Sequence, residues 1–375
     1  MAVSADLAME WKLGSVYPLI PGRLYFTVHS DDAHTARVIQ RETGLFLFSS
    51  FEHEKYRPYC SDFGPVDLES VVEFCRDVQT RMRDPRLTGR KLVYYCERDR
   101  AMRTNAAFLL GAYLVLVAGW TAEDAAKTFD RIVPCPFMMF RDATDLRSDF
   151  DLSILDCLKG LAKAVKEKWF DLDKFVVEDF KRKDDSGYSC LSPKFVAFQG
   201  PIARADRPDY AFEPSHFVEH FKEEGVGAVV RLNEAEHYDA QDFVRHGISH
   251  HHLEFEDCTV PPFEIIEKFF KICEETKGMV AVHCKAGLGR TGTLVALWIM
   301  SKYGWGARET IGWLRISRPG SIIGRQQHFL VAVEEEAAGG GPDGFRAAFE
   351  ALSVSGSDTS AAASQVANAL ASRRR

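Results

Sequence analysis

The sequence predicts an α/β fold with mostly parallel strands, arranged twice along a chain of 375 residues. In both halves, short runs of β-branched and aromatic residues alternate with longer stretches of helical periodicity. Strands separated by helices pair in parallel, because the crossover helix brings the chain back to the same end of the sheet. Since a single domain usually holds about 100–200 residues, we expect two such domains.

The elements of the first half follow from its hydrophobic periodicity. Strands are expected at 23–29 and 91–95, and helices at 68–83, 105–119 and 152–169. The charged segment 170–185, which Ser186 and Gly187 follow, is the best candidate for a linker.

The second half repeats the same alternation. Strands are expected at 194–198, 228–231, 252–255 and 279–283, and helices at 214–224, 243–246, 262–277, 291–303 and 307–316. Beyond about residue 337 the chain is rich in Gly, Ala and Ser and poor in large apolar residues. Such a composition does not form a core, so we expect a flexible tail.

The composition excludes several classes of protein. With 46% hydrophobic and 27% charged residues, and no apolar run of about 18 residues, the chain is expected neither to be disordered throughout nor to span a membrane. The net charge of −7 disfavours nucleic acid as a partner, because that binding depends on neutralising backbone phosphates. Residues 1–12 lack the features of a secretory signal, so we expect a reducing compartment. The nine cysteines form no zinc-binding pattern.

The segment from Met279 to Gly292 contains the residues that we expect to react. An apolar strand ends at His283, a glycine-rich loop follows, and a helix begins at once. Such a loop lets backbone N–H groups converge on one anion, and the helix N-terminus adds its positive dipole end. Cys284 opens the loop, where the amides and the Arg290 guanidinium favour the thiolate. The pattern therefore predicts a phosphate-binding loop with a cysteine nucleophile and a chelating arginine.

Two competing patterns are also present. Cys75 and Arg81 have the spacing of the nucleophile and the arginine, but they lie in a helical stretch without glycine, so we interpret them as structural. Residues 287–292 match the dinucleotide signature G-x-G-x-x-G. The acidic residue expected about 20 residues further on would fall inside a helix, which disfavours a dinucleotide site.

Transfer of a phosphoryl group to Cys284 requires an acid that protonates the leaving oxygen. Asp257 is the candidate, in a loop that two prolines stiffen before the next helix. Two alternatives stay open: Asp257 caps that helix, or Glu256 is the acid. A polar turn formed by 318–321 and 324–327 could place an amide near the site to orient the hydrolytic water.

These residues resemble one family, the cell-division-cycle-fourteen family of dual-specificity phosphatases, within the cysteine-based protein tyrosine phosphatases. The resemblance is close over 282–295, where Lys285, Ala286 and Leu288 make the signature specific. It extends to 63–65, 105–113, 140–143, 153–158 and 318–330, and in all it covers about 23–329.

The resemblance implies a role for each matching residue. Cys284 is the nucleophile, Arg290 binds phosphate and Asp257 is the general acid. Thr291 assists the thiolate, Gln326 positions water, and neither a metal nor another cofactor is needed. The phosphate-binding loop consists of Lys285, Ala286, Gly287, Leu288, Gly289 and Arg290.

The resemblance also implies two tandem dual-specificity-phosphatase-like domains joined by a linker helix, with only the second domain active. Each domain has a central, mostly parallel sheet flanked by helices. The expected division is an N-terminal extension at 1–15, a non-catalytic domain at 16–168, a linker at 169–190, a catalytic domain at 191–335 and a flexible tail at 336–375.

By the same resemblance, the substrates are phosphoproteins. They carry phosphoserine or phosphothreonine directly before Pro, with a basic residue further on. Cyclin-dependent kinases produce such sites. Phosphotyrosine is also hydrolysed. The resemblance implies roles in mitotic exit, cytokinesis or cilium and basal-body regulation. It places such a protein in nucleus and cytoplasm, with centrosome, basal body and spindle as narrower sites. Candidates for the substrate groove are Glu178, Asp179 and Phe140, although the basic residues 181–183 follow the acidic pair.

One departure from the family is Cys258, where the family usually has Gly after the general acid. It stiffens the loop and brings a second thiol near Cys284, so both simple packing and disulfide formation after oxidation are considered. A phosphoinositide phosphatase usually carries a lysine in place of Leu288, which argues against that activity. A phosphoprotein-binding pseudo-phosphatase is disfavoured, because nucleophile, arginine and acid are all present.

The first half repeats the pattern of strand, cysteine, loop, arginine and apolar helix. Cys96 follows a strand, and Arg103 precedes the helix. The loop between them is one residue longer than the loop after Cys284 and contains no glycine. The carboxylates of Glu97 and Asp99 would repel a phosphate there. We therefore predict that the first domain is a non-catalytic copy of the second.

Overall fold

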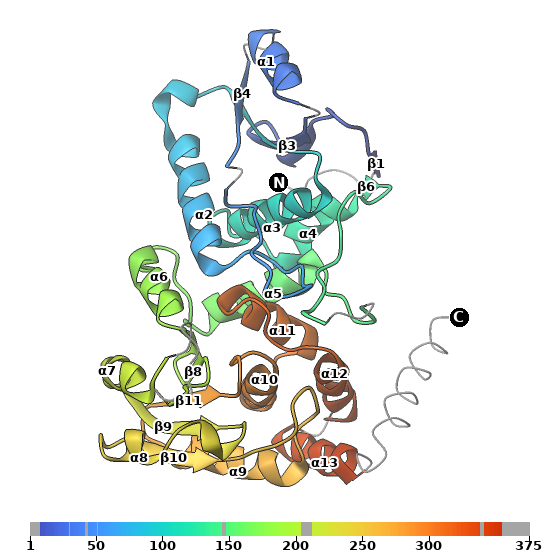
Figure 1. The fold of residues 1–375 in the computed structure, drawn as a ribbon. Coiled ribbons are helices and arrows are strands. Elements are labelled where there is room, and N and C mark those ends of the chain that lie inside the picture. Colours follow the sequence, from blue (N-terminus) through green and yellow to red (C-terminus); the bar gives the residue numbers. More distant parts are fainter. Residues whose placement is uncertain are drawn as a thin grey trace. The chain divides into compact units, whose positions relative to one another are not determined.

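The chain folds into two compact units in the computed structural model, most of whose helices and strands are labelled in Figure 1. The structure describes residues 8–29, 31–41, 44–50, 52–144, 148–203, 212–337 and 341–354. Unit 1 comprises Met1–Tyr59, Phe63–Arg141 and Asp151–Val177, and unit 2 comprises Cys60–Asp62, Asp142–Phe150 and Glu178–Arg375.

This division differs from the predicted domains in two segments. Residues 60–62 and the longer segment 142–150 were expected in the first domain, but they belong to unit 2. The reason is a set of specific contacts: the Gly324 amide donates a hydrogen bond to the Asp142 carboxylate, and the Phe150 ring meets His328 edge to face. The chain passes from unit 1 to unit 2 for the last time between Val177 and Glu178, inside the segment predicted as a linker.

The sheet of unit 1 has four strands in the order β2 (Tyr17–Ile20), β3 (Leu24–Val28), β5 (Lys91–Cys96) and β4 (Leu45–Phe48). β2 is antiparallel to β3, and the other pairs are parallel. A short parallel pair is formed by β1 (Met9–Glu10) and β6 (Ile132–Val133).

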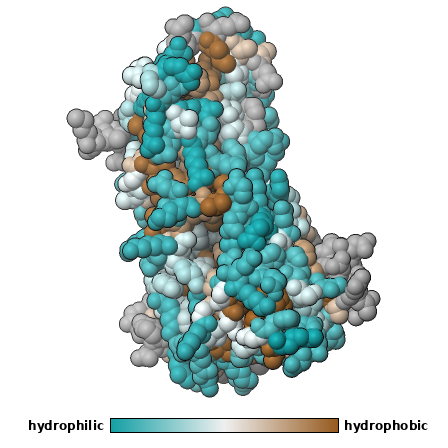
Figure 2. All heavy atoms as spheres, turned by 90° about the vertical axis from the view of Figure 1, so that its left-hand side faces the viewer, coloured by the Kyte–Doolittle hydropathy of each residue, from teal (hydrophilic) through white to brown (hydrophobic). Residues whose placement is uncertain are grey.

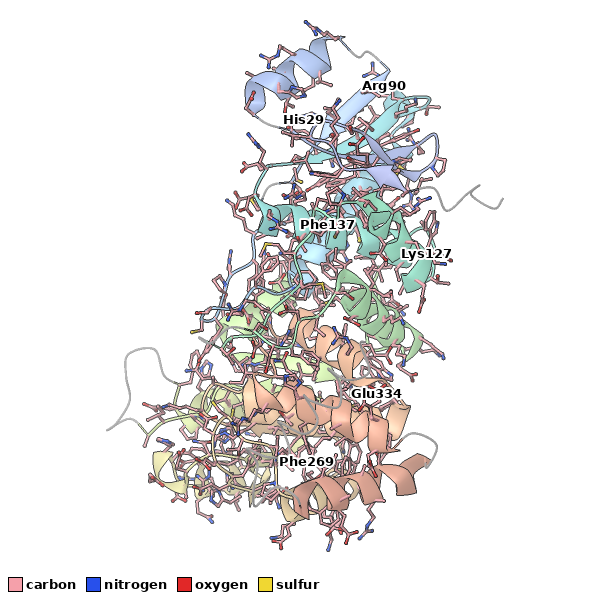
Figure 3. The ribbon with its side chains drawn as sticks, turned by 90° about the vertical axis from the view of Figure 1, so that its right-hand side faces the viewer. His29, Arg90, Lys127, Phe137, Phe269 and Glu334 are labelled. Carbon is pink, nitrogen blue, oxygen red and sulfur yellow. The ribbon has the colours of Figure 1, made fainter. Side chains whose placement is uncertain are left out.

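The helices of unit 1 are α1 (Asp32–Arg41), α2 (Leu68–Arg83), the 3₁₀ turn η1 (Pro85–Leu87), α3 (Arg100–Leu116), α4 (Ala122–Asp130) and α5 (Ile154–Lys166). α3 begins five residues before the predicted 105, because Asp99 caps its polar first turn by accepting a hydrogen bond from the Met102 amide. The ring of Phe137, labelled in Figure 3, packs edge to face on Phe129 of α4.

The sheet of unit 2 has five strands in the order β10 (Ser249–His252), β9 (Val226–Arg231), β11 (Met279–His283), β8 (Phe195–Phe198) and β7 (Tyr188–Ser192). β7 is antiparallel to β8, and all other pairs are parallel. β7 starts at 188, so the second domain begins before the predicted boundary at 191.

The helices of unit 2 are α6 (Val177–Asp185), α7 (Pro214–Glu224), the 3₁₀ turn η3 (Ala235–His237), α8 (Gln241–Val244), α9 (Phe263–Glu275), α10 (Gly289–Tyr303), α11 (Ala307–Ser317), α12 (Arg325–Ala337) and α13 (Gly341–Val354). Successive side chains of β8 point to opposite faces of the sheet, so the strand contributes to a hydrophobic core on each face. Phe198 packs against Phe217 of α7 on one face, and Phe195 stacks on Phe269 of α9 on the other. α9 and α10 therefore cover the face opposite to α7.

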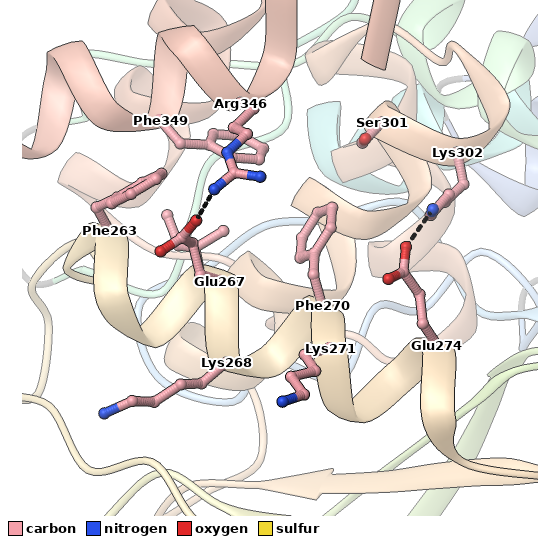
Figure 4. A pocket seen from close by; sticks show the side chains of 11 residues that line it. Phe263, Glu267, Lys268, Phe270, Lys271, Glu274, Ser301, Lys302, Arg346 and Phe349 are labelled. Carbon is pink, nitrogen blue, oxygen red and sulfur yellow. Dashed lines mark hydrogen bonds and ion pairs between the residues drawn. The ribbon is translucent and has the colours of Figure 1, made fainter. Parts of the chain in front are cut away.

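Helix α13 corrects the prediction of a flexible tail from 336. The segment 341–354 contains enough apolar residues to pack on α9: Phe349 meets Phe270 edge to face, with ring centroids 5.6 Å apart. Arg346 adds an ion pair with Glu267, and Figure 4 shows this pair at the groove that α9, α10 and α13 line. The rest of the predicted tail, from 355 on, lies outside the described residues.

The two units share one strand topology, which confirms the predicted duplication. β2, β3, β5 and β4 correspond to β7, β8, β11 and β9, and unit 1 lacks a strand that corresponds to β10 within its described residues. The register agrees: the Leu92 amide bonds the carbonyl just before Leu24 of β3, as the Val280 amide bonds the carbonyl just before Phe195 of β8. Four residues further on, Cys96 therefore corresponds to Cys284.

On the face shown in Figure 2, hydrophilic residues predominate and hydrophobic residues emerge in small groups. This is the ordinary surface of a chain whose large apolar residues are buried. Among the helices that the structure describes, none is long and apolar enough to cross a membrane.

Candidate active site

The predicted phosphate loop joins β11 to α10 at the carboxyl end of the unit 2 sheet. Cys284 follows β11 directly and is 3% exposed. Arg290 lies in the first turn of α10 and is 2% exposed. The first amides of a helix have no intrahelical partner, so the α10 N-terminus can donate to an anion held between these two residues.

Glycine is required at position 287 of this loop. Gly287 has φ +70°, and a Cβ there would lie 2.0 Å from the carbonyl oxygen of Phe198. A similar close approach occurs at Gly200, where a Cβ would lie 2.2 Å from the Cys284 carbonyl oxygen. The loop is therefore packed directly on the backbone at the end of β8.

Arg318 holds the outer side of the loop, a role that sequence analysis missed. Its guanidinium donates to the carbonyls of Gly287, at 2.9 Å, and Ala286, at 3.2 Å, and to the Ser189 hydroxyl, at 3.0 Å. These bonds fix both carbonyls toward Arg318. The only available signal was that Arg318 opens the polar turn noted after the helix at 307–316.

Arg290 is fixed by two backbone carbonyls. Its NH1 donates to Phe255, at 2.9 Å, and to Leu232, at 3.2 Å. Its Nε lies 3.1 Å from Oδ1 of Asp257 in an ion-pair contact without hydrogen-bond geometry. The predicted phosphate-binding arginine and the predicted acid are therefore adjacent.

The position of Asp257 excludes one of the three interpretations of this loop. α9 begins at Phe263, and Pro262 occupies its N-cap position without a side-chain hydrogen bond, so Asp257 does not cap the helix. Asp257 makes the ion-pair contact with Arg290, whereas the carbonyl of Glu256 accepts a hydrogen bond from the Thr259 hydroxyl. Asp257 has a side chain that is 54% exposed, which leaves it accessible to a substrate.

Gln326 links the acid loop to the phosphate loop. It lies in the first turn of α12 and is fully buried. Its Nε2 donates to the Thr259 carbonyl, at 3.1 Å, and its Oε1 accepts from the Ile323 amide, at 3.2 Å. A Cβ on Gly289 would lie 3.0 Å from Oε1, so the amide group borders the phosphate loop. The polar turn thus places the Gln326 amide beside Gly289, while its role toward water stays a prediction.

The remaining loop residues differ in exposure. Lys285 is exposed, Ala286 is half-buried, and Leu288 is 7% exposed. The hydroxyl of Thr291 is fully buried and has no hydrogen-bond partner among the described residues. A buried hydroxyl without a partner is costly, and at the base of a phosphate loop it is free to donate to a thiolate.

The three residues predicted to line a substrate groove differ in their exposure and contacts. The Phe140 side chain is fully buried in unit 1, where its ring packs against Phe63 and Phe108. That ring is not available to a substrate, which corrects the prediction. Glu178 is exposed at the start of α6. Asp179 is bound by its own helix through ion pairs with Arg182, at 2.8 Å, and Lys183, at 2.9 Å.

Cys258 adopts a backbone conformation that favours glycine, with φ +59°. It is exposed, and partial burial together with the neighbouring Asp257 carboxylate raises the pKa of its thiol. The family's usual Gly suits this conformation better than a side chain does.

Unit 1 contains no comparable cradle in its described part. Burial raises the pKa of the Cys96 thiol, and the nearby Glu54 adds to this effect. Burial also raises the pKa of Glu54 to about 8, and its carboxyl hydrogen-bonds the Tyr94 hydroxyl. The competing Cys75 is fully buried within α2, as expected of a structural thiol.

No group of three or more His, Cys, Asp or Glu side chains that could hold a metal occurs in the part of the chain that the structure describes.

Comparisons with protein families agree with this site. The model "Dual specificity protein phosphatase, N-terminal half" matches residues 18–164, and "Polymorphic toxin system, DSP-PTPase phosphatase" matches 211–304. The first match falls on the strands and helices of unit 1. The second spans both the acid loop and the phosphate loop.

Curated relatives cover most of the chain. Human dual specificity protein phosphatase CDC14A is 40% identical over 76% of this chain and 48% of the relative. Human dual specificity protein phosphatase CDC14C is 34% identical over 84% of this chain and 70% of the relative. The tyrosine-protein phosphatase CDC14 homolog of Schizosaccharomyces pombe is 34% identical over 85% of this chain and 60% of the relative. The chain thus spans about half the length of human CDC14A.

Among solved structures, the active form of Tk-PTP matches at 24% identity with a TM-score of 0.33, over 40% of this chain and 97% of that chain.

Proposed function

Because the chain belongs to the CDC14 family of dual-specificity protein phosphatases, we propose that it hydrolyses phosphoserine, phosphothreonine and phosphotyrosine in proteins through a cysteinyl-phosphate intermediate. The observation that carries this proposal is the juxtaposition of Cys284, buried Arg290 and Asp257 around one helix N-terminus. These groups supply a nucleophile, a phosphate ligand and an acid within one site.

In the first step, the Cys284 thiolate attacks phosphorus and the bond to the substrate oxygen breaks. The amides of the loop and the Arg290 guanidinium hold the three non-bridging oxygens. Asp257 gives its proton to the leaving oxygen, so the product leaves as an alcohol or phenol. The unpartnered Thr291 hydroxyl is suited to donate to the thiolate when sulfur leaves phosphorus again.

In the second step, water attacks the cysteinyl phosphate and the S–P bond breaks. Asp257, now ionised, takes the proton of the water by the reverse of its first role. Gln326 borders the loop near Gly289 and is suited to orient that water. Inorganic phosphate and the thiolate are the products.

Hydrolysis of para-nitrophenyl phosphate tests this proposal. We expect turnover by the wild type and at least a thousand-fold loss in Cys284→Ser and Arg290→Ala, since each removes a group that acts in the chemical step. A phosphorylated Cys284, trapped by acid quench and found by mass spectrometry, would identify the intermediate. Full activity in Cys284→Ser would refute the mechanism.

We further propose proline-directed sites of the cyclin-dependent-kinase type as substrates, and with them a role in mitotic exit, cytokinesis or cilium regulation. The proposal rests on the family. The ion pairs of Asp179 with Arg182 and Lys183 satisfy one of the two carboxylates that would attract a downstream basic residue. We therefore expect a weak preference for such a residue in peptide panels that compare phosphoserine-Pro with and without a downstream Lys.

Two other activities are less well supported. Leu288 is 7% exposed and offers no charge for the additional phosphates of an inositol ring. A binding protein without turnover would not need the contact between Asp257 and Arg290. Hydrolysis of a phosphoinositide at a rate above that of phosphopeptides would favour the first alternative.

A further inference from the structure

Tyr238 bridges two histidines behind the phosphate loop. Its hydroxyl lies 2.7 Å from Nε2 of His283 and 2.8 Å from Nε2 of His250. Tyr238 follows the 3₁₀ turn η3 and is 4% exposed. His283 ends β11 and is fully buried, while His250 is half-buried on β10 at the sheet edge.

The tautomer of His283 follows from its second contact. Its Nδ1 lies 2.9 Å from the carbonyl oxygen of Cys284. A carbonyl oxygen only accepts, so Nδ1 must carry the hydrogen. Burial lowers the pKa of His283 to about 3, so the ring is neutral and its Nε2 has no hydrogen. Nε2 is therefore an acceptor.

This assignment fixes the direction of the other two bonds. Burial raises the pKa of Tyr238, so its hydroxyl stays protonated and donates its one hydrogen to His283. The Tyr238 oxygen must then accept from Nε2–H of His250. Burial lowers the pKa of His250 to about 4, so this ring is neutral at pH 7 and its single hydrogen is on Nε2.

From this geometry we infer that His250 is a positioning residue, the first donor in a one-directional chain that runs through Tyr238 and His283 to the carbonyl of Cys284. The inference deepens the proposed function, on which its catalytic consequence rests. This hydrogen-bond chain holds the carbonyl of the nucleophile, which lies against Gly200. The loop then presents amide hydrogens, and not a carbonyl dipole, to the thiolate and the phosphate.

His250 matters because a tyrosine hydroxyl can rotate. If the Tyr238 oxygen lost the donor from His250, only the Arg231 guanidinium, among the described residues, would remain as a hydrogen-bond donor to it. The hydroxyl would then be held less firmly in the orientation that donates to His283. His283 would then lose its fixed tautomer, and the Cys284 carbonyl would lose its donor part of the time.

Matched variants of two neighbouring histidines allow a test. His250→Gln keeps an N–H donor at about the reach of Nε2, His250→Leu removes the donor, and His251→Leu alters the next residue of β10, whose side chain faces the opposite side of the strand. We expect kcat on para-nitrophenyl phosphate to fall about tenfold in His250→Leu, as for one lost hydrogen bond. KM should stay within about twofold, and both other variants should stay within about threefold of wild type.

A spectroscopic measurement makes the inference independent of turnover and of variant folding. Two-bond ¹H–¹⁵N correlation spectra of the full wild-type chain at pH 7 distinguish the tautomers of each histidine ring. We expect Nδ1–H for His283 and Nε2–H for His250. Nε2–H on His283, or unchanged kcat in His250→Leu, would overturn the inference. Absence of any turnover in the wild type would instead defeat the proposed function and leave the tautomer result standing.

Discussion

The carboxylate of Asp142 accepts a hydrogen bond from the amide of Gly324, at 2.5 Å, and another from the Thr144 hydroxyl, at 3.0 Å. Asp142 is 2% exposed. Gly324 has φ +53° and forms the turn that leads into α12 and Gln326. A residue from the first half of the sequence thus fixes the turn that carries the amide beside the phosphate loop.

Asp142→Ala should destabilise unit 2 by about 1.5–3 kcal/mol, the usual contribution of a hydrogen bond to a charged group. It should also slow the second chemical step through Gln326. We expect a rapid burst of para-nitrophenol followed by steady-state turnover about tenfold below wild type. Urea unfolding and stopped-flow absorbance measure the two effects. Asp149→Ala is the control, since its side chain is 80% exposed in its contact with His328; equal effects of both substitutions would contradict the prediction.

Asp257→Ala should lower the rate on alkyl phosphate esters by about 10²–10⁴-fold, because a poor leaving group needs its proton. The loss on aryl esters with good leaving groups should be much smaller. Glu256→Ala is the matched control in the same loop. A larger loss from Glu256→Ala, or equal losses of Asp257→Ala on both ester classes, would reject Asp257 as the acid.

Gly287→Ala and Gly304→Ala separate backbone strain from close packing. Both glycines have positive φ, but a Cβ at Gly287 would lie 2.0 Å from the Phe198 carbonyl oxygen, while a Cβ at Gly304 meets nothing within 4 Å. We expect a cost of about 1–2 kcal/mol at Gly304 from strain alone and a larger cost at Gly287, together with loss of vanadate binding. Calorimetry and inhibition by vanadate measure these effects, and retention of vanadate binding in Gly287→Ala would count against the packing argument.

Glu54→Gln should reduce the loss of unit 1 stability between pH 5 and pH 8. The pKa of Glu54 is raised by burial to about 8 in the folded chain, against an ordinary value of 4.5. In this window the folded state therefore binds more protons than the unfolded state, and stability falls as the pH rises. Glutamine keeps the shape and cannot ionise. Thermal unfolding at pH 5 and pH 8 measures the difference; Glu52→Gln, at an exposed carboxyl nearby, should behave as wild type.

Peroxide treatment tests the two interpretations of Cys258. If its thiol reaches the oxidised Cys284, a disulfide forms between them and protects Cys284 from further oxidation. Mass spectrometry should then find this linkage, and Cys258→Gly should be inactivated irreversibly at a higher rate. Equal inactivation rates and no linkage would leave Cys258 a simple surface thiol. Cys258→Gly should also raise unit 2 stability by about 0.5–1 kcal/mol, because it relieves the positive φ.

Sequence alone predicted the elements with strong periodicity. The limits of α2 and α7 and of β11 agree with the predicted 68–83, 214–224 and 279–283. β10 was expected at 252–255 but lies at Ser249–His252, because an edge strand of Ser and His carries no apolar alternation. Periodicity also missed α12, whose first turn is polar.

In the site, the residues of the continuous loop motif could be predicted because one short segment contains them all. Arg318, Tyr238 and Asp142 could not, since each acts on the loop or its neighbours from a distant part of the sequence. Hydrogen bonds between segments far apart in the chain leave no periodic trace, so only the structure brings these residues together. Phe140 was misassigned for the opposite reason: its sequence neighbourhood matched the family, but burial removes it from the surface.

Because β5 and β11 share their register, unit 1 still presents a cysteine at the carboxyl end of its sheet. Regaining turnover there would require a shorter loop, new glycines and removal of the Glu97 and Asp99 carboxylates together. No one of these changes opens a cradle by itself, so none would be rewarded by activity. Burial and the nearby Glu54 raise the pKa of the Cys96 thiol, so these changes would still leave a thiol that resists ionisation. We therefore expect a single substitution in unit 1 to leave it without a working phosphate loop.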